Sequence, residues 1–381
     1  MGDATTRRTA ARHARALGVG VALLAGCGGG GERRADSAGG AVTDDGAAVG
    51  APASAAASAA AAAEPEMQAV LDQHAKLGPK PIETLTPEEA RRQPTPADAV
   101  TALLVAQGKD TTPAALVPGV TAADRTVRGA AGDLPATVYT PEGAGPFPVV
   151  VYFHGGGWVI ADRKVYDGGA RGLAKAANAV VVSVDYRRAP EAKFPAQHDD
   201  ALAAYRWALA NAASIKGDPK RVALAGESAG GNLAVATAVA ARDAGLQAPA
   251  AVVSVYPIAQ PDTTTASYAT YAAAKPLNRP MMGWFAKHTT RTPADLQDPR
   301  IALVKANLAN LPPVTIVNAE IDPLRDDGAM LERALKAADV PVERRLYDGV
   351  AHEFFGMAAV EARAKDAQAY AGSRLKAAFG G

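Results

Sequence analysis

Ser228, in the stretch GESAG (226–230), has the setting in this chain that best suits nucleophilic chemistry. The pattern G-x-S-x-G is typical of a sharp strand-to-helix turn that exposes a serine hydroxyl for attack on an acyl carbon. Because the chain has 37 glycines among 381 residues, such a pattern arises by chance at roughly 0.1 per chain. The alternative is a serine that only permits tight packing, so position and partners must decide.

A glycine-rich loop, HGGGW (154–158), lies upstream and can supply backbone donors. Attack on an ester creates an oxyanion, which preorganised N–H groups must meet. Glycines suit this role because they bring their N–H groups to a substrate without a side chain in the way. The spacing matches neither G-x-G-x-x-G nor G-x-x-x-x-G-K-[ST], so a nucleotide loop is disfavoured and a structural glycine turn is the remaining alternative. We expect His154 to orient this loop rather than to act as a base.

His352 is the predicted general base. If the chain order is Ser…Asp…His, the acid and the base both follow the nucleophile. Of the two histidines after Ser228, His352 lies in DGVAHEFFG, a predicted loop after the last strand, where a triad histidine belongs. His288 lies beside Trp284 and Phe285 in an irregular stretch, and we expect it to be an ordinary helix residue.

Asp322 is the predicted acid that orients this histidine. It begins the loop in NAEIDPLRDDG, directly after a predicted strand, and Pro323 stiffens that loop. Asp326 and Asp327 lie further on, where we expect them to cap the next helix. The sequence therefore predicts a triad of Ser228, Asp322 and His352, which uses neither a metal nor a cofactor.

Buried strands alternate with helices along most of the chain. Continuous apolar, β-branched runs are typical of strands that are buried on both faces of a parallel sheet. After a hairpin formed by DRTVRG and PATVYT, such runs lie at 146–154, 178–186 and 220–227, and further predicted strands follow at 249–257, 312–320 and 342–348. Helical patterns lie at 168–177, 196–213, 229–244, 326–338 and 358–378. The alternation predicts an α/β fold with a mostly parallel sheet, and it places Ser228 between a strand and a helix.

Three segments do not fit this alternation. Residues 64–108 contain two Thr-Pro pairs that each open a predicted helix, with Thr as the cap and Pro in the first turn. Residues 259–308 contain no clear strand and are too long for a simple connection, so we expect an inserted helical element. Residues 109–122 have no pattern that places them.

Five stretches together resemble one known family. HGGGW, DYRRAPE (185–191), GESAG, EIDPL and DGVAHEFF are similar to the motifs of the hormone-sensitive-lipase-like branch, or bacterial family IV, of the α/β hydrolases. The resemblance covers about residues 70–380. It implies an α/β-hydrolase fold with a mostly parallel, eight-stranded sheet flanked by helices. It also implies a helical cap over the active site, made from residues 64–108 and 259–308.

The resemblance also implies roles for single residues. Three backbone N–H groups would receive the oxyanion, those of Gly156, Gly157 and Ala229. Three residues support the motifs, namely His154, Gly155 and Glu191. We expect Glu191 and Glu227 to hold nearby loops. A cap favours a modest pocket, and its candidate walls are Trp158, Trp284, Phe285 and the tyrosines near 268–271.

The predicted function is a serine carboxylesterase that hydrolyses short- to medium-chain acyl esters. An amidase or formamidase could use the same triad, and the sequence does not separate the two substrates. A non-catalytic ligand-binding protein on this fold would have lost a triad member, and none is missing here. The balance of 40 Lys and Arg against 39 Asp and Glu argues against nucleic acid as a partner and leaves a small-molecule ester.

The N-terminus predicts export. A positive region, RRTAARHAR, precedes the short apolar stretch ALGVGVALLAG, which is the plan of a secretory signal peptide at 1–26. LLAGC (23–27) resembles the lipobox of bacterial lipoproteins, in which the cysteine, here Cys27, is lipidated and becomes the new N-terminus. We expect a membrane-anchored lipoprotein of the cell envelope, with a periplasmic or secreted protein as the alternative.

The rest of the chain divides into two parts. Residues 27–63 are rich in Gly, Ala and Ser and predict a flexible tether, and residues 64–381 form the predicted hydrolase domain. Cys27 is the one cysteine of the chain, so a disulfide within the chain and a cysteine-rich metal site are both excluded.

Overall fold

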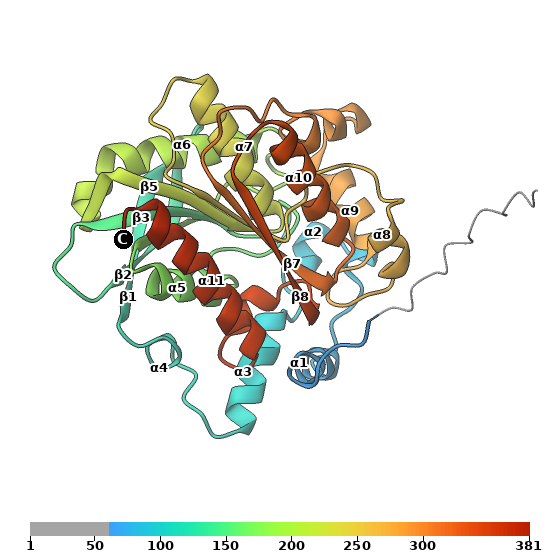
Figure 1. Ribbon diagram of the computed structural model, residues 1–381. Helices are drawn as coiled ribbons and strands as arrows, with labels where there is room; N and C mark the ends of the chain where they lie inside the picture. The colour runs from blue at the N-terminus through green and yellow to red at the C-terminus, as the bar shows by residue number, and fades with distance from the viewer. Residues whose placement is uncertain (1–60) are drawn as a thin grey trace, which may run out of the picture. The chain divides into compact units, whose positions relative to one another are not determined.

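One eight-stranded sheet organises the protein in this computed structural model, which describes residues 61–381 (Figure 1). The strands are β1 (Val120–Arg128), β2 (Asp133–Pro141), β3 (Phe147–Phe153), β4 (Val180–Val184), β5 (Gly217–Glu227), β6 (Val252–Val255), β7 (Val314–Ile321) and β8 (Val342–Ala351). Their order is β1-β2-β4-β3-β5-β6-β7-β8. β2 pairs antiparallel with β1 and β4, and the remaining pairs are parallel. The predicted mostly parallel, eight-stranded α/β sheet is confirmed.

Helices cover both faces of this sheet. The α-helices are α1 (Pro65–Lys76), α2 (Pro87–Ala90), α3 (Pro96–Ala106), α4 (Pro113–Leu116), α5 (Asp167–Ala177), α6 (Ala196–Asn211), α7 (Ala229–Asp243), α8 (Ala266–Thr270), α9 (Arg279–Thr289), α10 (Arg325–Ala337) and α11 (Ala362–Ala378). Buried residues of α5 and α11 pack on one face of the sheet, and those of α6, α7 and α10 pack on the other.

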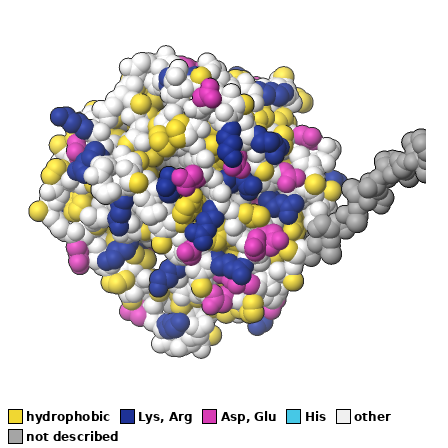
Figure 2. All heavy atoms as spheres, in the orientation of Figure 1, with side chains coloured by type: hydrophobic (Ala, Val, Ile, Leu, Met, Phe, Trp, Pro, Cys, Tyr) yellow, Lys and Arg dark blue, Asp and Glu magenta, His cyan; other side chains and the backbone are white. Residues whose placement is uncertain are grey.

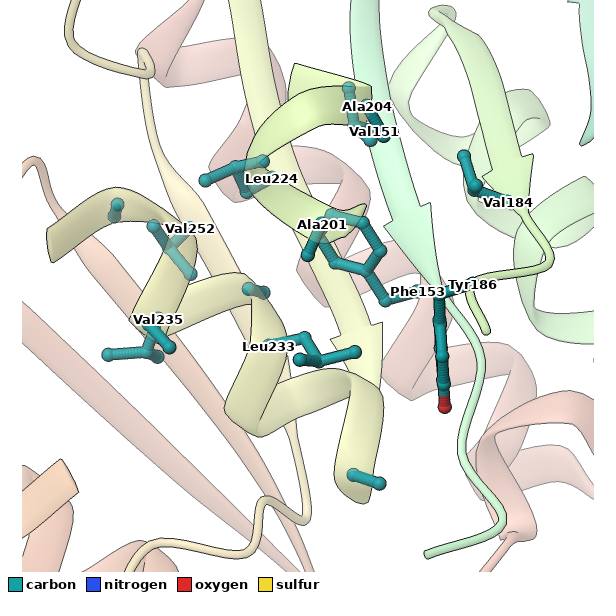
Figure 3. Close-up of a cluster of buried hydrophobic side chains, with 14 of the residues drawn as sticks. Val151, Phe153, Val184, Tyr186, Ala201, Ala204, Leu224, Leu233, Val235 and Val252 are labelled. Carbon is teal, nitrogen blue, oxygen red and sulfur yellow. The ribbon is translucent and has the colours of Figure 1, made fainter. Parts of the chain in front are cut away.

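The side chains of β3 alternate between the two faces of the sheet, and this explains why the sequence of the strand is an unbroken apolar run. Val149 and Val151 belong to the core under α6 and α7, whereas Val150 and Tyr152 belong to the core under α5 and α11. Successive side chains of a strand point to opposite faces, so a strand that is covered on both faces must be apolar at every position. Figure 3 shows the α6–α7 side, where Val151 and Phe153 lie near side chains of both helices, including Ala201, Ala204 and Leu233.

The segment that the sequence did not place, 109–122, joins the N-terminal helices to the sheet. It contains the short helix α4 and the first residues of β1. In Figure 1 this segment runs from the end of α3 through α4 to the edge of the sheet. The sequence of this segment did not predict a helix because α4 has no buried residue. Apolar residues at helical spacing, which mark a buried helix face, are therefore not needed there.

Two predicted helix starts in the N-terminal segment are confirmed in detail. Thr86 caps α2 and Thr95 caps α3, each with a proline in the first turn. In both, the threonine hydroxyl accepts a hydrogen bond from the backbone N–H of an acidic residue three positions on, Glu89 or Asp98. The carboxylate of that residue accepts one from the threonine N–H in return.

Two aspartates tie the insertion between β6 and β7 to the start of α10. We expected Asp326 and Asp327 to cap α10, but Leu324 holds that position and both aspartates lie in the first turn. Asp327 is fully buried and accepts hydrogen bonds from the backbone N–H of Ala259 at 3.0 Å and from Gln260 Nε2 at 2.7 Å. Asp326 accepts one from the N–H of Ser267 at 2.8 Å. These carboxylates therefore satisfy backbone donors of the insertion rather than those of their own helix.

Positive and negative side chains are interspersed on the face drawn in Figure 2, as the near-neutral net charge of the chain suggests. Across residues 61–381, no helix has the length and apolar character needed to cross a membrane. The predicted signal peptide (1–26), the predicted lipidation site Cys27 and nearly all of the predicted tether lie outside the described residues.

Candidate active site

Ser228 lies at the turn between β5 and α7, with a backbone φ of 57° and ψ of −116°. A non-glycine residue rarely has a positive φ, and such strain is common where a fold presents a functional group. Two close backbone approaches hold the turn. A Cβ on Gly226 would lie 2.2 Å from the carbonyl oxygen of Gly230, and one on Gly230 would lie 1.9 Å from that of Phe153. Both glycines of GESAG are therefore required by packing, as the pattern predicts.

Gly230→Ala should destabilise the protein strongly. The added methyl group would overlap the carbonyl of Phe153, which belongs to a central strand and cannot move freely. We expect a loss of about 3 kcal/mol or more in the free energy of unfolding, at or beyond the upper end for overpacked cores. Urea unfolding measures this change. Gly245→Ala is the control, because the space around Gly245 is open and only its positive φ is strained.

The predicted triad residues form a continuous chain of hydrogen bonds. His352 Nε2 lies 3.0 Å from Ser228 Oγ, and His352 Nδ1 lies 2.7 Å from Asp322 Oδ2. The other oxygen of Asp322 accepts a hydrogen bond from the N–H of Leu324 at 2.8 Å. All three side chains are buried. Asp322 follows β7 and His352 follows β8, so the carboxyl ends of three parallel strands bring the residues together.

The surroundings of His352 favour the imidazolium ion. Burial lowers the pKa of His352, but the charge of Asp322 and its hydrogen bond outweigh burial, so the pKa lies above its usual value. The ring of Tyr256 lies against the imidazole, with the ring centroids 4.5 Å apart. His352 can therefore take up the proton of Ser228 and hold it while an ester bond breaks.

The glycine loop lies beside Ser228. Gly156 and Gly157 line the same cavity as Ser228 and His352, and both have positive φ values, 86° and 57°. Ala229 is the first residue of α7, where a helix leaves its N–H groups without intrahelical acceptors. Within residues 61–381, the N–H groups of Gly156, Gly157 and Ala229 have no hydrogen-bond acceptor. They are available to an oxyanion.

A cavity of about 350 Å³ opens onto Ser228 and His352. Residues from both segments that depart from the strand–helix alternation line it. Those from 64–108 include Leu71, His74 and Ile82, and those from 259–308 include Leu277, Met281 and Phe285. Phe285 packs so closely on the glycine loop that a Cβ on Gly157 would lie 2.3 Å from its ring. The insertion therefore fixes one wall of the cavity and the position of the loop together.

A family model for the alpha/beta hydrolase fold matches residues 150–356. This chain belongs to the α/β-hydrolase family. The match spans β3 to the loop after β8, so it includes the glycine loop, Ser228, Asp322 and His352.

Relatives of this hydrolase are esterases. Carboxylesterase NlhH of Mycobacterium tuberculosis is 40% identical over 277 residues, which cover 70% of this chain and 86% of that protein. Ethyl acetate hydrolase of Pseudomonas putida is 34% identical over 233 residues, which cover 60% of this chain and 73% of that protein. The solved structure of a thermostable esterase from Pseudomonas putida superposes with a TM-score of 0.74 at 32% identity and covers 84% of this chain and 98% of its own.

The hydrolase holds His154 away from the proton chain of the triad. His154 is fully buried and stacks on Tyr186, with ring centroids 4.3 Å apart. Its Nδ1 donates to the carbonyl of Gly155 at 2.9 Å, and its Nε2 lies 3.7 Å from Asp185. Burial lowers the pKa of His154, so the ring is neutral at pH 7. His154 therefore contacts the glycine loop, and its role in orienting that loop stays a prediction.

Glu191 joins the N-terminal segment to the loop that follows β4. It forms a bidentate ion pair with Arg91, in which both N···O distances are 2.7 Å. Arg91 also donates to the backbone carbonyls of Val159 and Ala189. A planar guanidinium with this many partners fixes the relative position of three segments. Sequence reasoning assigned Glu191 to a scaffold but gave no signal for Arg91.

A buried carboxylate lies directly before Ser228. Glu227 is fully enclosed and accepts hydrogen bonds from the hydroxyls of Tyr152 and Tyr256. Burial raises the pKa of Glu227 to about 7, although the two hydroxyls oppose that effect. Glu353, directly after His352, accepts a hydrogen bond from Tyr166 at 2.7 Å. Both carboxylates line a second hollow of about 1110 Å³ between α3, α5 and α11, which Ser228 and His352 do not reach.

The candidate pocket walls are only partly where the sequence suggested. Phe285 lines the cavity, but Trp158, Trp284 and Tyr268 are buried outside its lining. Trp284 donates its indole N–H to the carbonyl of Leu85 at 3.0 Å, so it ties the insertion to the N-terminal segment. His288 lies in α9, as expected, and its ring packs edge-on against Trp284.

Proposed function

We propose that this chain is a serine carboxylesterase in which Ser228 is the nucleophile, His352 the general base and Asp322 the orienting acid. The continuous hydrogen-bond chain from Ser228 through His352 to Asp322 carries this proposal. The α/β-hydrolase family and the esterases among its relatives make the chain a carboxylic ester hydrolase. What we add is the assignment of the reaction to these residues.

The reaction proceeds in two halves. His352 removes the proton of Ser228 as Oγ attacks the ester carbonyl, while Asp322 holds the imidazole and stabilises the imidazolium. The N–H groups of Gly156, Gly157 and Ala229 receive the oxyanion. The C–O bond then breaks, and His352 gives its proton to the leaving alcohol. Water repeats the steps on the acyl-enzyme and releases the acid and free Ser228.

The size of the cavity supports short or medium acyl chains. A volume of about 350 Å³ is near the lower end of small-molecule sites. Similar relatives include ethyl acetate hydrolase of Pseudomonas putida and a putative acetyl-hydrolase of Mycobacterium tuberculosis. We expect kcat/KM for p-nitrophenyl esters to be highest for acyl chains of two to about eight carbons. A maximum at palmitate, or faster release from p-nitroanilides than from matched esters, would contradict the proposal.

The rate should fall on the acidic side with a midpoint above the ordinary histidine pKa of about 6.5. The charge and hydrogen bond of Asp322 raise the pKa of His352 against the effect of burial, and the protonated ring cannot accept the proton of Ser228. As pH decreases through this pKa, kcat/KM should therefore fall by about tenfold per pH unit. A pH profile of p-nitrophenyl butyrate hydrolysis measures the midpoint. If the midpoint on the acidic side of the pH profile lay well below 6.5, Asp322 would not stabilise the imidazolium.

We also propose that Cys27 carries the lipid that anchors the mature enzyme in the cell envelope. The lipobox-like stretch LLAGC and the position of Cys27 as the one cysteine support this assignment. Mass spectrometry of the enzyme from a bacterial membrane fraction should show an acylated Cys27 as the N-terminal residue. A mature protein that begins elsewhere, without acyl chains, would contradict the proposal.

A further inference from the structure

Arg188 differs from its neighbouring arginines because no carboxylate neutralises it. Arg91, Arg163 and Arg187 form ion pairs with Glu191, Asp185 and Asp200, respectively. Within the described residues, no carboxylate oxygen lies within 4.0 Å of the Arg188 guanidinium. Its hydrogen-bond acceptor is the backbone carbonyl of Ala161, to which Nη1 donates. A guanidinium has five N–H groups, so most of its donors remain available.

Ala161, whose carbonyl accepts the hydrogen bond from Arg188, lies against the glycine loop. A Cβ on Gly156 would lie 3.0 Å from the Cβ of Ala161, so Ala161 packs directly on Gly156. Arg188 and Ala161 both line the cavity that holds Ser228. The guanidinium is therefore fixed beside the glycine loop, and it lines the same cavity as Ser228.

The other charges at this cavity are hydrogen-bonded, exposed or of the opposite sign, and they include Glu83, whose Oε2 is buried without a hydrogen-bond partner among the described residues. Asp162 accepts hydrogen bonds from the N–H groups of Lys164 and Val165, and Glu353 accepts one from Tyr166. Lys80, which also lines the cavity, is exposed. Arg188 is half-buried and fixed by a backbone carbonyl, so it can present a planar pair of donors at a constant place. That geometry matches a carboxylate better than a lysine does.

We propose that Arg188 is a specificity-determining residue that selects esters carrying a second, anionic carboxylate group. The inference rests on the proposed esterase function. A half-buried cation without an acidic partner is less well solvated than an exposed one, and a substrate carboxylate would supply charge-assisted hydrogen bonds that the carbonyl of Ala161 does not. The preferred substrates would thus be half-esters of dicarboxylic acids or acyl esters of hydroxy acids, depending on which side of the scissile bond faces Arg188.

Two matched substrate pairs test this proposal. Mono-p-nitrophenyl adipate and its methyl ester differ by one charge on the acyl side, and 4-(butyryloxy)benzoate and its methyl ester differ by one charge on the alcohol side. We expect the wild-type enzyme to prefer the anionic member of one pair by about tenfold or more in kcat/KM. Arg188→Met should reduce that preference by about 10- to 100-fold. Arg188→Lys should retain part of it.

The controls separate a specific role from general electrostatics and from folding. Lys80→Met removes a cation from the same cavity and should change the preference by less than about threefold, because Lys80 is exposed and screened. The proposal is overturned if the wild type prefers the anionic member of neither pair. It is also overturned if Arg188→Met lowers kcat/KM equally for both members. Hydrolysis of neutral p-nitrophenyl butyrate by the wild type shows independently whether the esterase proposal itself holds.

Discussion

Replacing Ser228 by alanine should lower kcat for p-nitrophenyl butyrate by about 10⁴- to 10⁶-fold. The hydroxyl of Ser228 lies 3.0 Å from His352 Nε2, and no other side chain in the described part of the chain hydrogen-bonds to that nitrogen. Without Oγ, no covalent acyl-enzyme forms at this site, and only binding and the oxyanion donors remain to accelerate hydrolysis. Steady-state kinetics with a correction for spontaneous hydrolysis measures the loss.

The alanine variant should retain the fold. Serine and alanine have nearly the same volume, Ser228 is buried, and its backbone carries the same positive φ in either case. Ser267→Ala is the matched control, because Ser267 is also a buried serine with hydrogen bonds, but it serves the insertion. An unchanged thermal transition together with wild-type hydrolysis in Ser228→Ala would eliminate Ser228 as the nucleophile.

Asp322→Asn should lower kcat by about 10⁴-fold while the shape of the site is kept. Asp322 Oδ2 accepts the Nδ1 proton of His352, and an amide placed there can offer its N–H₂ group instead, which favours the wrong tautomer. The variant also loses the charge that raises the pKa of His352, whereas the lowering effect of burial persists. The residual activity should therefore show an acidic limb at lower pH than the wild type.

Asp326→Asn is the matched control for this loop. Asp326 lies four residues further on and binds the N–H of Ser267 rather than a triad residue. We expect it to change kcat by less than about threefold and to leave the acidic limb in place. Equal losses in the two variants would show that the loop needs its negative charges for stability rather than for the orientation of His352.

The triad could be predicted from the sequence because each member follows a predicted strand in a fixed chain order. Strands were predicted at 220–227, 312–320 and 342–348, and the structure has β5, β7 and β8 at these places. In a parallel sheet, the carboxyl ends of neighbouring strands lie at the same edge. Order in the sheet then brings together residues that are up to 124 positions apart in the chain.

Contacts between segments could not be predicted, because they depend on packing that has no sequence period. Arg91 reaches Glu191, and Asp327 reaches the backbone of Ala259, across gaps of 100 and 68 residues. Of the two tyrosines that enclose Glu227, Tyr152 lies on β3 and Tyr256 directly follows β6. Trp158 and Trp284 were candidate pocket walls because aromatic residues suit both pockets and cores, and only the structure separates the two uses.

The nucleophile can be identified directly by covalent labelling. The oxygen of an activated serine displaces fluoride from a fluorophosphonate and leaves a stable phosphonyl ester, so peptide mass spectrometry after labelling locates the attacking oxygen. We predict one phosphonyl group per chain, on the peptide that contains Ser228, formed in parallel with the loss of p-nitrophenyl butyrate hydrolysis. Complete inhibition with the label on a different residue, or full hydrolysis by a chain labelled at Ser228, would contradict the assignment of the reaction to Ser228, Asp322 and His352.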